Sequence, residues 1–92
     1  MVANTEIAEQ AMYKLYPNPN NGNMVLDYTI NETDKAIMEI YDVSGKLIRS
    51  YSLNPASNQL ILNEDKLNNG AYFYQLRVNN QLVQSDKLII IK

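Results

Sequence analysis

Short runs in which apolar and polar residues alternate restrict the fold of this chain more than any other feature of its sequence. The clearest runs lie at 24–30, 36–41 and 72–78. Successive side chains of a β-strand point to opposite faces of its sheet, so a period of two is typical of a strand with one buried face. We therefore expect three sets of side chains to face a core: Met24, Leu26, Tyr28 and Ile30; Ala36, Met38 and Ile40; and Tyr72, Tyr74, Leu76 and Val78.

Residues that favour tight turns separate these runs. Asn and Gly accept a positive φ, and they occur together at 20–23 and 68–70. The segment 43–46 has the pattern of a tight turn, and Asn79-Asn80 fits the central positions of a type I′ hairpin. At least eight of the thirteen Asn residues lie in or next to such turns, so we expect those to specify topology. The thirteen are Asn4, Asn18, Asn20, Asn21, Asn23, Asn31, Asn54, Asn58, Asn63, Asn68, Asn69, Asn79 and Asn80.

Weaker strand candidates complete the pattern at 46–53, 60–62 and 81–91, and strong helix signals are absent. Alternation within 46–53 is imperfect, so the sequence does not assign its buried face. Short strands at a spacing of about 8–12 residues are typical of an antiparallel sandwich. The expected fold class is all-β, an antiparallel Ig-like β-sandwich of about seven short strands. A chain of 92 residues, 46% of them hydrophobic, suits one domain with a single core.

Composition argues against most kinds of enzyme. The chain has no Cys and no His, so it lacks thiolate chemistry and the side chain best suited to proton transfer near neutral pH. Its three Gly residues are too scattered for a Rossmann fingerprint or a phosphate loop. We therefore predict no catalytic residue, no cofactor and no metal site.

Charge and hydropathy argue against two classes of partner. A net charge of −2, from 8 basic and 10 acidic side chains, is unlike the basic footprint of nucleic-acid binding. The longest uninterrupted apolar run, 88–91, is far shorter than the ~20 residues that span a membrane. We expect neither nucleic-acid binding nor membrane insertion.

Two polar segments could be read as a metal site or an acid–base pair, but a turn or loop explains each of them better. Asn18 to Gly22 carries oxygen-bearing side chains as a calcium loop does, but it contains no carboxylate. Glu64 and Asp65 are adjacent, so on a strand they would point to opposite faces and make a poor acid–base pair. We expect both acids to be solvated in a loop or in a single helical turn.

Tyrosines are the remaining candidates for ligand binding. Tyr72 and Tyr74 share the phase of the core residues, so we expect their hydroxyls to reach a partner or the surface. Tyr13, Tyr16 and Tyr51 are expected to be exposed, which leaves a binding role open for them.

Four motifs in a fixed order carry a resemblance to a known family. They are Tyr16-Pro17-Asn18-Pro19; the segment 40–47 with Asp42, Gly45 and Lys46; the segment 67–72 with Leu67, Gly70 and Tyr72; and a final Lys87-Leu88-Ile89-Ile90-Ile91-Lys92. In order and spacing, this set resembles the type A C-terminal sorting domain of the type IX (Por) secretion system of Bacteroidetes. The resemblance covers residues 15–92, with departures at Asn68, where Pro is common in the family, and at 63–65.

Each of the first three motifs also suits a sandwich. Pro17 and Pro19 favour extended conformations in the residues before them, so the chain should enter as an edge strand and then turn. Asp42 can accept backbone N–H groups of its own turn, which Gly45 closes. In the segment 67–72, we expect Leu67 to anchor a loop. Gly70 should allow the backbone conformation that is needed just before Tyr72 enters the core.

The resemblance implies a sorting function without catalysis. Domains of this family direct the cargo protein covalently linked to their N-terminus from the periplasm across the outer membrane, to the cell surface or extracellular space. The implied partners are the type IX translocon and outer-membrane shuttle proteins, and a sortase-like surface peptidase that removes the domain. The implied division is a linker and cleavage region at 1–14, cut within 2–14, and a sorting domain at 15–92 whose last strand, 87–92, carries much of the recognition.

A second class of function fits the same composition. An Ig-like module that binds carbohydrate, or that spaces the domains of a secreted enzyme, would need no more chemistry than this chain offers. A sorting domain must lie at the natural C-terminus of its protein, whereas such a module can lie anywhere. Exposed sheet edges also leave room for strand addition by a partner or for a homodimer.

Overall fold

The structure, a computed structural model, describes residues 13–92. These residues form seven strands: β1 (Tyr13–Tyr16), β2 (Asn23–Tyr28), β3 (Ala36–Tyr41), β4 (Leu47–Leu53), β5 (Gln59–Asn63), β6 (Gly70–Val78) and β7 (Gln81–Ile90). Within this part of the chain, no helix is long and apolar enough to cross a membrane.

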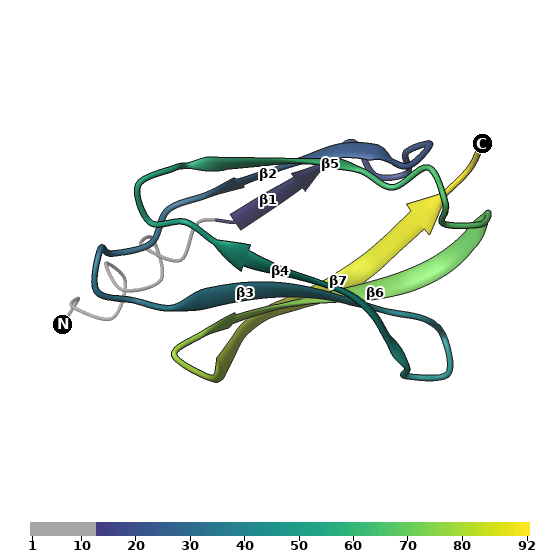
Figure 1. Ribbon diagram of the computed structural model, residues 1–92. Helices are drawn as coiled ribbons and strands as arrows, with labels where there is room; N and C mark the ends of the chain where they lie inside the picture. Colours follow the sequence, from purple (N-terminus) through teal and green to yellow (C-terminus); the bar gives the residue numbers. More distant parts are fainter. Residues whose placement is uncertain (1–12) are drawn as a thin grey trace, which may run out of the picture.

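The strands form two sheets that pack face to face (Figure 1). One sheet has the order β1-β2-β5 and the other the order β4-β3-β6-β7. Every pairing between neighbouring strands is antiparallel. The expected all-β antiparallel sandwich is confirmed.

The core lies between the sheets and contains the side chains that alternation assigns to it. Leu26, Met38 and Leu76 are almost completely buried, and each comes from a different strand. Ile30 and Val78 are only partly buried, because Ile30 lies beyond the end of β2 and Val78 is the last residue of β6. The buried set is Leu15, Met24, Leu26, Tyr28, Ala36, Met38, Ile40, Leu53, Leu62, Leu67, Tyr72, Tyr74, Leu76, Leu88 and Ile90.

The imperfect pattern of β4 has a structural reason. The register of β4 against β3 shifts between Ile40 and Tyr41. Arg49 stands opposite Ile40, and Tyr51 stands opposite Met38, so both point between the sheets. Because β4 is an edge strand, a long polar side chain can point inward there and still reach solvent or a polar partner.

The loops gather at two ends of the sandwich (Figure 1). At one end, which we call the motif end, lie the β1–β2 loop (17–22), the β3–β4 turn (42–46), the β5–β6 loop (64–69) and residues 91–92. At the other end, which we call the linker end, lie Tyr13, the β2–β3 and β4–β5 loops and the turn between β6 and β7. All four sequence motifs therefore meet at the same end.

The turn between β6 and β7 has the expected hairpin conformation. Asn79 and Asn80 both have positive φ values, 53° and 68°, which a type I′ turn requires at its two central positions. Asn79 also holds the neighbouring loop, because its backbone N–H donates to the Lys35 carbonyl at 2.7 Å.

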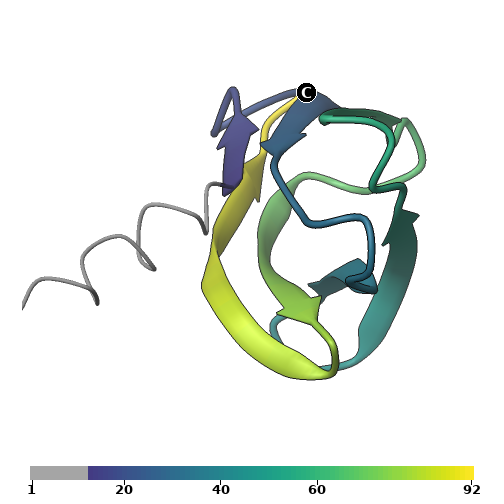
Figure 2. The ribbon, with the colours of Figure 1, turned by 90° about the vertical axis from the view of Figure 1, so that its left-hand side faces the viewer.

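The two long sides of the sandwich differ in their edge strands. On one side, β1 and the end of β7 lie together, purple beside yellow in Figure 2, and a parallel bridge joins Asn20 to Ile90 there. On the other side, an ion pair joins Arg49 of β4 to Glu64, which follows β5. The two sheets are thus linked along both sides.

Candidate recognition surface

The first motif holds the last strand in place. The Asn18 side chain donates from Nδ2 to the Lys87 carbonyl at 2.7 Å, and its Oδ1 accepts from the Ile89 N–H at 3.0 Å. An amide side chain with one donor and one acceptor can replace a backbone partner at a sheet edge. Asn18 therefore hydrogen-bonds to the open edge of β7 as the backbone of a neighbouring strand would.

Asn20 continues this contact with its backbone. Its N–H donates to the Ile89 carbonyl at 3.0 Å, and its carbonyl accepts from the Ile91 N–H at 2.7 Å. Its side chain is buried, donates to the Pro17 carbonyl at 2.9 Å and accepts from the Gly22 N–H at 2.7 Å. The β1–β2 loop thus covers the outer edge of β7 from 87 to 91.

Gly22 lets the first loop approach the third one. The Gly22 carbonyl accepts from the Glu64 N–H at 2.7 Å. A Cβ atom at Gly22 would lie 2.6 Å from the Glu64 carbonyl oxygen, and the φ of Gly22 is +104°. Only glycine meets both conditions without strain.

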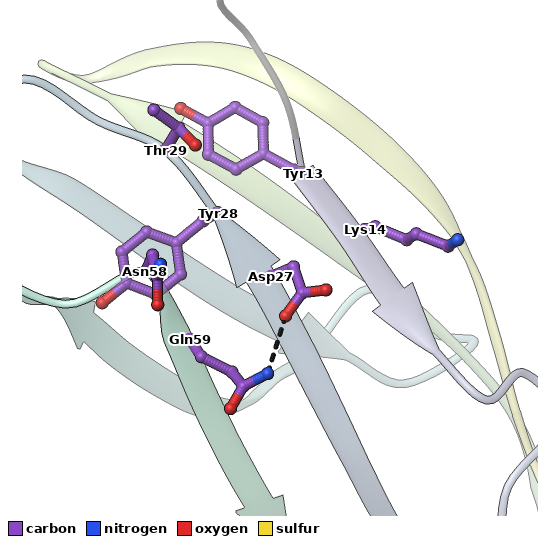
Figure 3. Close-up of a pocket in the computed structure, with 7 residues that line it drawn as sticks. All are labelled: Tyr13, Lys14, Asp27, Tyr28, Thr29, Asn58 and Gln59. Atoms are coloured by element: carbon purple, nitrogen blue, oxygen red, sulfur yellow. Dashed lines mark hydrogen bonds between the residues drawn. The ribbon is translucent and has the colours of Figure 1, made fainter.

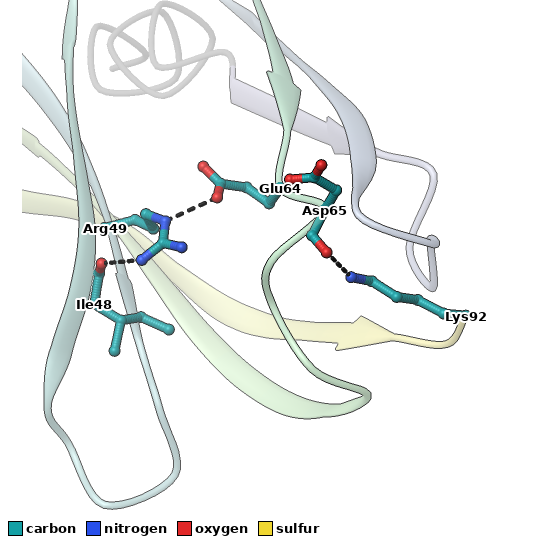
Figure 4. Close-up of polar contacts among 5 residues, drawn as sticks. All are labelled: Ile48, Arg49, Glu64, Asp65 and Lys92. Atoms are coloured by element: carbon teal, nitrogen blue, oxygen red, sulfur yellow. Dashed lines mark hydrogen bonds and ion pairs between the residues drawn. The ribbon is translucent and has the colours of Figure 1, made fainter.

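The C-terminal residue is held by the β5–β6 loop (Figure 4). The Lys92 N–H donates to Asn69 Oδ1 at 2.9 Å, and Lys92 Nζ donates to the Asp65 carbonyl at 2.5 Å. Together with the β1–β2 loop, these contacts place residues 87–92 between two of the other motifs.

An ion pair closes the opposite side of the motif end (Figure 4). Arg49 Nε lies 2.8 Å from Glu64 Oε1, and only 12% of the Glu64 side chain is exposed. Glu64 lies in a loop, as expected, but the expectation that its side chain is solvated is wrong. Its carboxylate pairs with the inward-pointing guanidinium of an edge strand on the other sheet.

The side chains of residues 87–92 divide into two sets. Leu88 and Ile90 are fully buried and belong to the core, and Ile89 is half-buried. Lys87, Ile91 and Lys92 are exposed. A partner that contacts the folded domain can therefore touch only the second set fully.

The turn of the second motif is built around one carboxylate. Asp42 Oδ1 accepts from the Ser44 hydroxyl at 2.6 Å, the Ser44 N–H at 2.9 Å and the Lys46 N–H at 3.0 Å. These bonds, above all the one from the Ser44 hydroxyl, lower the pKa of Asp42 below its ordinary value of 3.8, because they favour the charged form. Gly45 has a φ of +90°, so the expected roles of Asp42 and Gly45 in the turn are confirmed.

The third motif enters the core as expected. Leu67 is buried in the β5–β6 loop, and Gly70 opens β6 with a φ of +151°. The Tyr72 ring is buried, and its hydroxyl donates to the Asn68 carbonyl at 2.7 Å. Tyr72 thus ties its own lead-in loop to the core.

The remaining tyrosines do not form an exposed platform. Tyr13, Tyr16 and Tyr51 are half-buried, so the expectation that they are exposed is wrong. Tyr16 donates to Asp27 at 2.9 Å, and this bond raises the pKa of Tyr16. The Tyr51 hydroxyl is buried and has no hydrogen-bond partner within the described part of the chain.

A hollow on the three-stranded sheet lies near the linker end (Figure 3). Asp27 stands at its middle and accepts from Gln59 at 3.0 Å, while its other oxygen accepts from Tyr16. Both carboxylate oxygens are thus engaged within the domain. The hollow is lined by Tyr13, Lys14, Asp27, Tyr28, Thr29, Asn58 and Gln59, all outside the four motifs.

The sequence did not predict which loop residues form the hydrogen bonds between one loop and another. Asn20, Gly22 and Asn69 link the motifs to one another, but before the fold is known each appears only as a turn former. The segment 18–22 forms a turn, as expected, whose side chains bond to the protein itself. Within residues 13–92, no three acidic, His or Cys side chains form a group that could hold a metal ion.

The fold defines a small antiparallel β-sandwich module whose sequence motifs all lie at one end. A family described as the secretion system C-terminal sorting domain matches residues 14–92. The chain belongs to this family, the C-terminal sorting domains of the type IX secretion system, as the four motifs indicated. None of the curated proteins compared with the chain matches it.

Membership in the family assigns the general role. The domain is a C-terminal signal for type IX secretion in Bacteroidetes, and its destination is the cell surface or extracellular space. A type IX sorting signal interacts with the secretion machinery, and the family is not one of enzymes.

Proposed function

We propose that the type IX translocon and its outer-membrane shuttle proteins recognise the motif end of the folded sandwich. The observation that carries this proposal is that all four motifs of the family lie at this end, and that the loops holding the first and third motifs are hydrogen-bonded to residues 87–92. The recognised element is then a surface assembled from three loops and the last strand, and it exists only when the domain is folded. The domain itself catalyses nothing.

The accessible part of this surface is small and mixed in character. It presents Lys87, Ile91 and Lys92, with Lys66 from the β5–β6 loop. The Asp42 turn lies at the same end, but away from the C-terminus (Figure 1). Ile91 is 60% exposed, so a partner that covers it gains the burial of an apolar side chain.

Fusion of the whole chain to the C-terminus of an exported reporter tests this proposal in a type IX-competent host. We expect the reporter to cross the outer membrane, and deletion of Leu88–Lys92 to retain it in the periplasm. Because the deletion also removes two core side chains, circular dichroism must show whether the truncated domain folds. A reporter that stays in the periplasm with the intact chain would contradict the sorting role, and it would favour the accessory module that binds carbohydrate or spaces other domains.

We further propose that a sortase-like peptidase at the cell surface removes the domain by cutting within residues 2–14. Tyr13 and Lys14 pair with Tyr28 and Asp27 in the sheet, and proteases favour segments that are not paired. We therefore place the cut before Tyr13, with residues 1–14 as the linker region and 15–92 as the sorting domain.

The position of Tyr13 supports a cut that is made while the secretion machinery is bound to the domain. Tyr13 lies at the linker end, and residues 87–92 lie at the motif end. Machinery bound to the motif end would therefore leave the junction with the cargo accessible. The mass of the secreted reporter gives the cut directly: a C-terminus between residues 2 and 12 supports the proposal, and a reporter that keeps Tyr13–Lys92 contradicts it.

A further inference from the structure

Three of the four edge strands carry features that hinder pairing with another strand. The edges are β1, β5, β4 and β7. The β1–β2 loop already bonds to the edge of residues 87–91. The rest of β7, 81–86, carries Asp86 and a register shift against β6, and bulges and charges also hinder pairing. β1 has four residues and is followed by Pro17, and β4 points the charge of Arg49 inward. Short strands, prolines, covering loops and inward charges are the devices by which natural sheets avoid edge-to-edge association.

β5 has neither a charge, a proline nor a covering loop. It contains Gln59, Leu60, Ile61, Leu62 and Asn63, and it pairs with β2 without a register shift. Its one exposed apolar side chain, Ile61, is 65% exposed. β5 is therefore the least protected edge in the described part of the chain.

The hydrogen-bond pattern shows which backbone groups of β5 point outward. The Tyr28 N–H donates to the Asn58 carbonyl at 3.0 Å. Hydrogen-bonded pairs alternate along an antiparallel ladder, so Leu60 and Leu62 bond to β2. The N–H and C=O groups of Gln59, Ile61 and Asn63 consequently face the open edge.

We propose that β5 pairs antiparallel with β5 of a second copy of this chain, around a two-fold axis at Ile61. A two-fold axis at Ile61 places Ile61 opposite Ile61 of the second copy, and Gln59 of each copy opposite Asn63 of the other. No like charges oppose one another, and the side-chain amides can hydrogen-bond across the junction. The two three-stranded sheets become one six-stranded sheet, in which Val25, the neighbour of Ile61, extends the apolar row on both sides.

The contact is small, so the dimer is weak and reversible. A five-residue strand with one apolar side chain at its centre buries less than the ~1,200 Å² typical of stable complexes. Sedimentation velocity of the full chain between about 10 µM and about 1 mM covers the corresponding range of dissociation constants. We expect a shift from monomer to dimer across this range.

A matched pair of lysine variants locates the interface. Ile61→Lys places two like charges at the axis and should weaken the dimer about tenfold or more, because directly opposed like charges are destabilising. Leu82→Lys, at a residue 50% exposed on β7, makes the same change away from β5 and should leave the dimer unaffected. A chain that remains monomeric up to about 1 mM, or a dimer that Ile61→Lys does not weaken, would overturn the proposal.

A cross-link gives an independent result if Ile61→Lys disturbs folding. The chain has no Cys, so Ile61→Cys introduces a single thiol. Hydrogen-bonded partners in an antiparallel ladder lie about 5.5 Å apart between Cα atoms, which is within the range of a disulfide. We expect Ile61→Cys to form a disulfide dimer under mild oxidation and Leu82→Cys to form much less of it. Equal cross-linking by the two variants would overturn the proposal. Linkage of Ile61→Cys only to other proteins in the host would show that the partner at the β5 edge is not a second copy of this chain, and would overturn it too.

Discussion

Gly22 is the residue at which the close approach of two loops depends on the absence of a side chain. Gly22→Ala would bring a Cβ atom to 2.6 Å from the Glu64 carbonyl oxygen, whereas a Cβ at Gly45 meets no atom within 4 Å. Both glycines have positive φ values, so alanine strains the backbone at both positions, by about 1 kcal/mol. The clash should add about 1–3 kcal/mol at Gly22 alone. Urea unfolding of the two variants measures the difference, and equal stabilities would contradict the packing described for the two loops.

Asn18 gives the most local test of the contact that covers β7. Asn18→Ala removes the acceptor of the Ile89 N–H, and a hydrogen bond of this kind contributes about 1 kcal/mol. Exchange of the Ile89 amide hydrogen should therefore become faster by about fivefold. Asn21→Ala is the control, because Asn21 bonds to Asn23 in its own turn. An unchanged exchange rate at Ile89 in Asn18→Ala would mean that the Asn18 side chain does not protect this amide.

Asp42 makes the second motif sensitive to acid. Since its pKa is lowered in the folded state, the stabilising bonds are fully present above the ordinary value of 3.8 and are lost as the pH falls through the lower folded value. The backbone amide resonances of Ser44 and Lys46 should shift in this acid range. Asp42→Asn keeps an acceptor oxygen but does not titrate, so its resonances should stay constant. An identical pH response in Asp42→Asn would show that another group is responsible.

At the scale of the element, β7 and the two residues after it combine a buried face with accessible side chains. Leu88 is fully buried, whereas Ile91 is 60% exposed. Leu88→Ala should destabilise the domain by about 2–5 kcal/mol, since it leaves a cavity in the core. Ile91→Ala keeps its backbone N–H bond to Asn20 and should change stability by less than about 0.5 kcal/mol. Thermal unfolding compares them, and similar losses would mean that Ile91 also supports the fold.

The sequence predicted the strands that have one buried face and one exposed face. Alternation located β2, β3 and β6 because each of them has one face in the core and one outside it. It did not resolve β4, where Arg49 and Tyr51 point inward at an edge. The partner of Arg49 could not be predicted either, because Glu64 is 15 residues away and follows a strand of the other sheet.

At the scale of the whole molecule, the motifs identified the family but not their own arrangement. Their order along the chain says nothing of which ends of the strands coincide, because antiparallel pairing between distant segments decides that. Asn18 lies 69 residues from Lys87 and 71 from Ile89 in sequence. The meeting of all four motifs at one end is therefore a property of the fold, and it is the basis for the recognition surface proposed above.

Recognition of the motif end can be measured as the fraction of a fused reporter that crosses the outer membrane, compared between two matched variants. Ile91→Asp changes an apolar side chain 60% exposed at the motif end, and Leu82→Asp changes one 50% exposed near the linker end. Circular dichroism of each variant serves as the control for folding. We expect the reporter to stay in the periplasm with Ile91→Asp and to be secreted normally with Leu82→Asp. Equal secretion with the two folded variants, or retention with Leu82→Asp alone, would contradict recognition at the motif end.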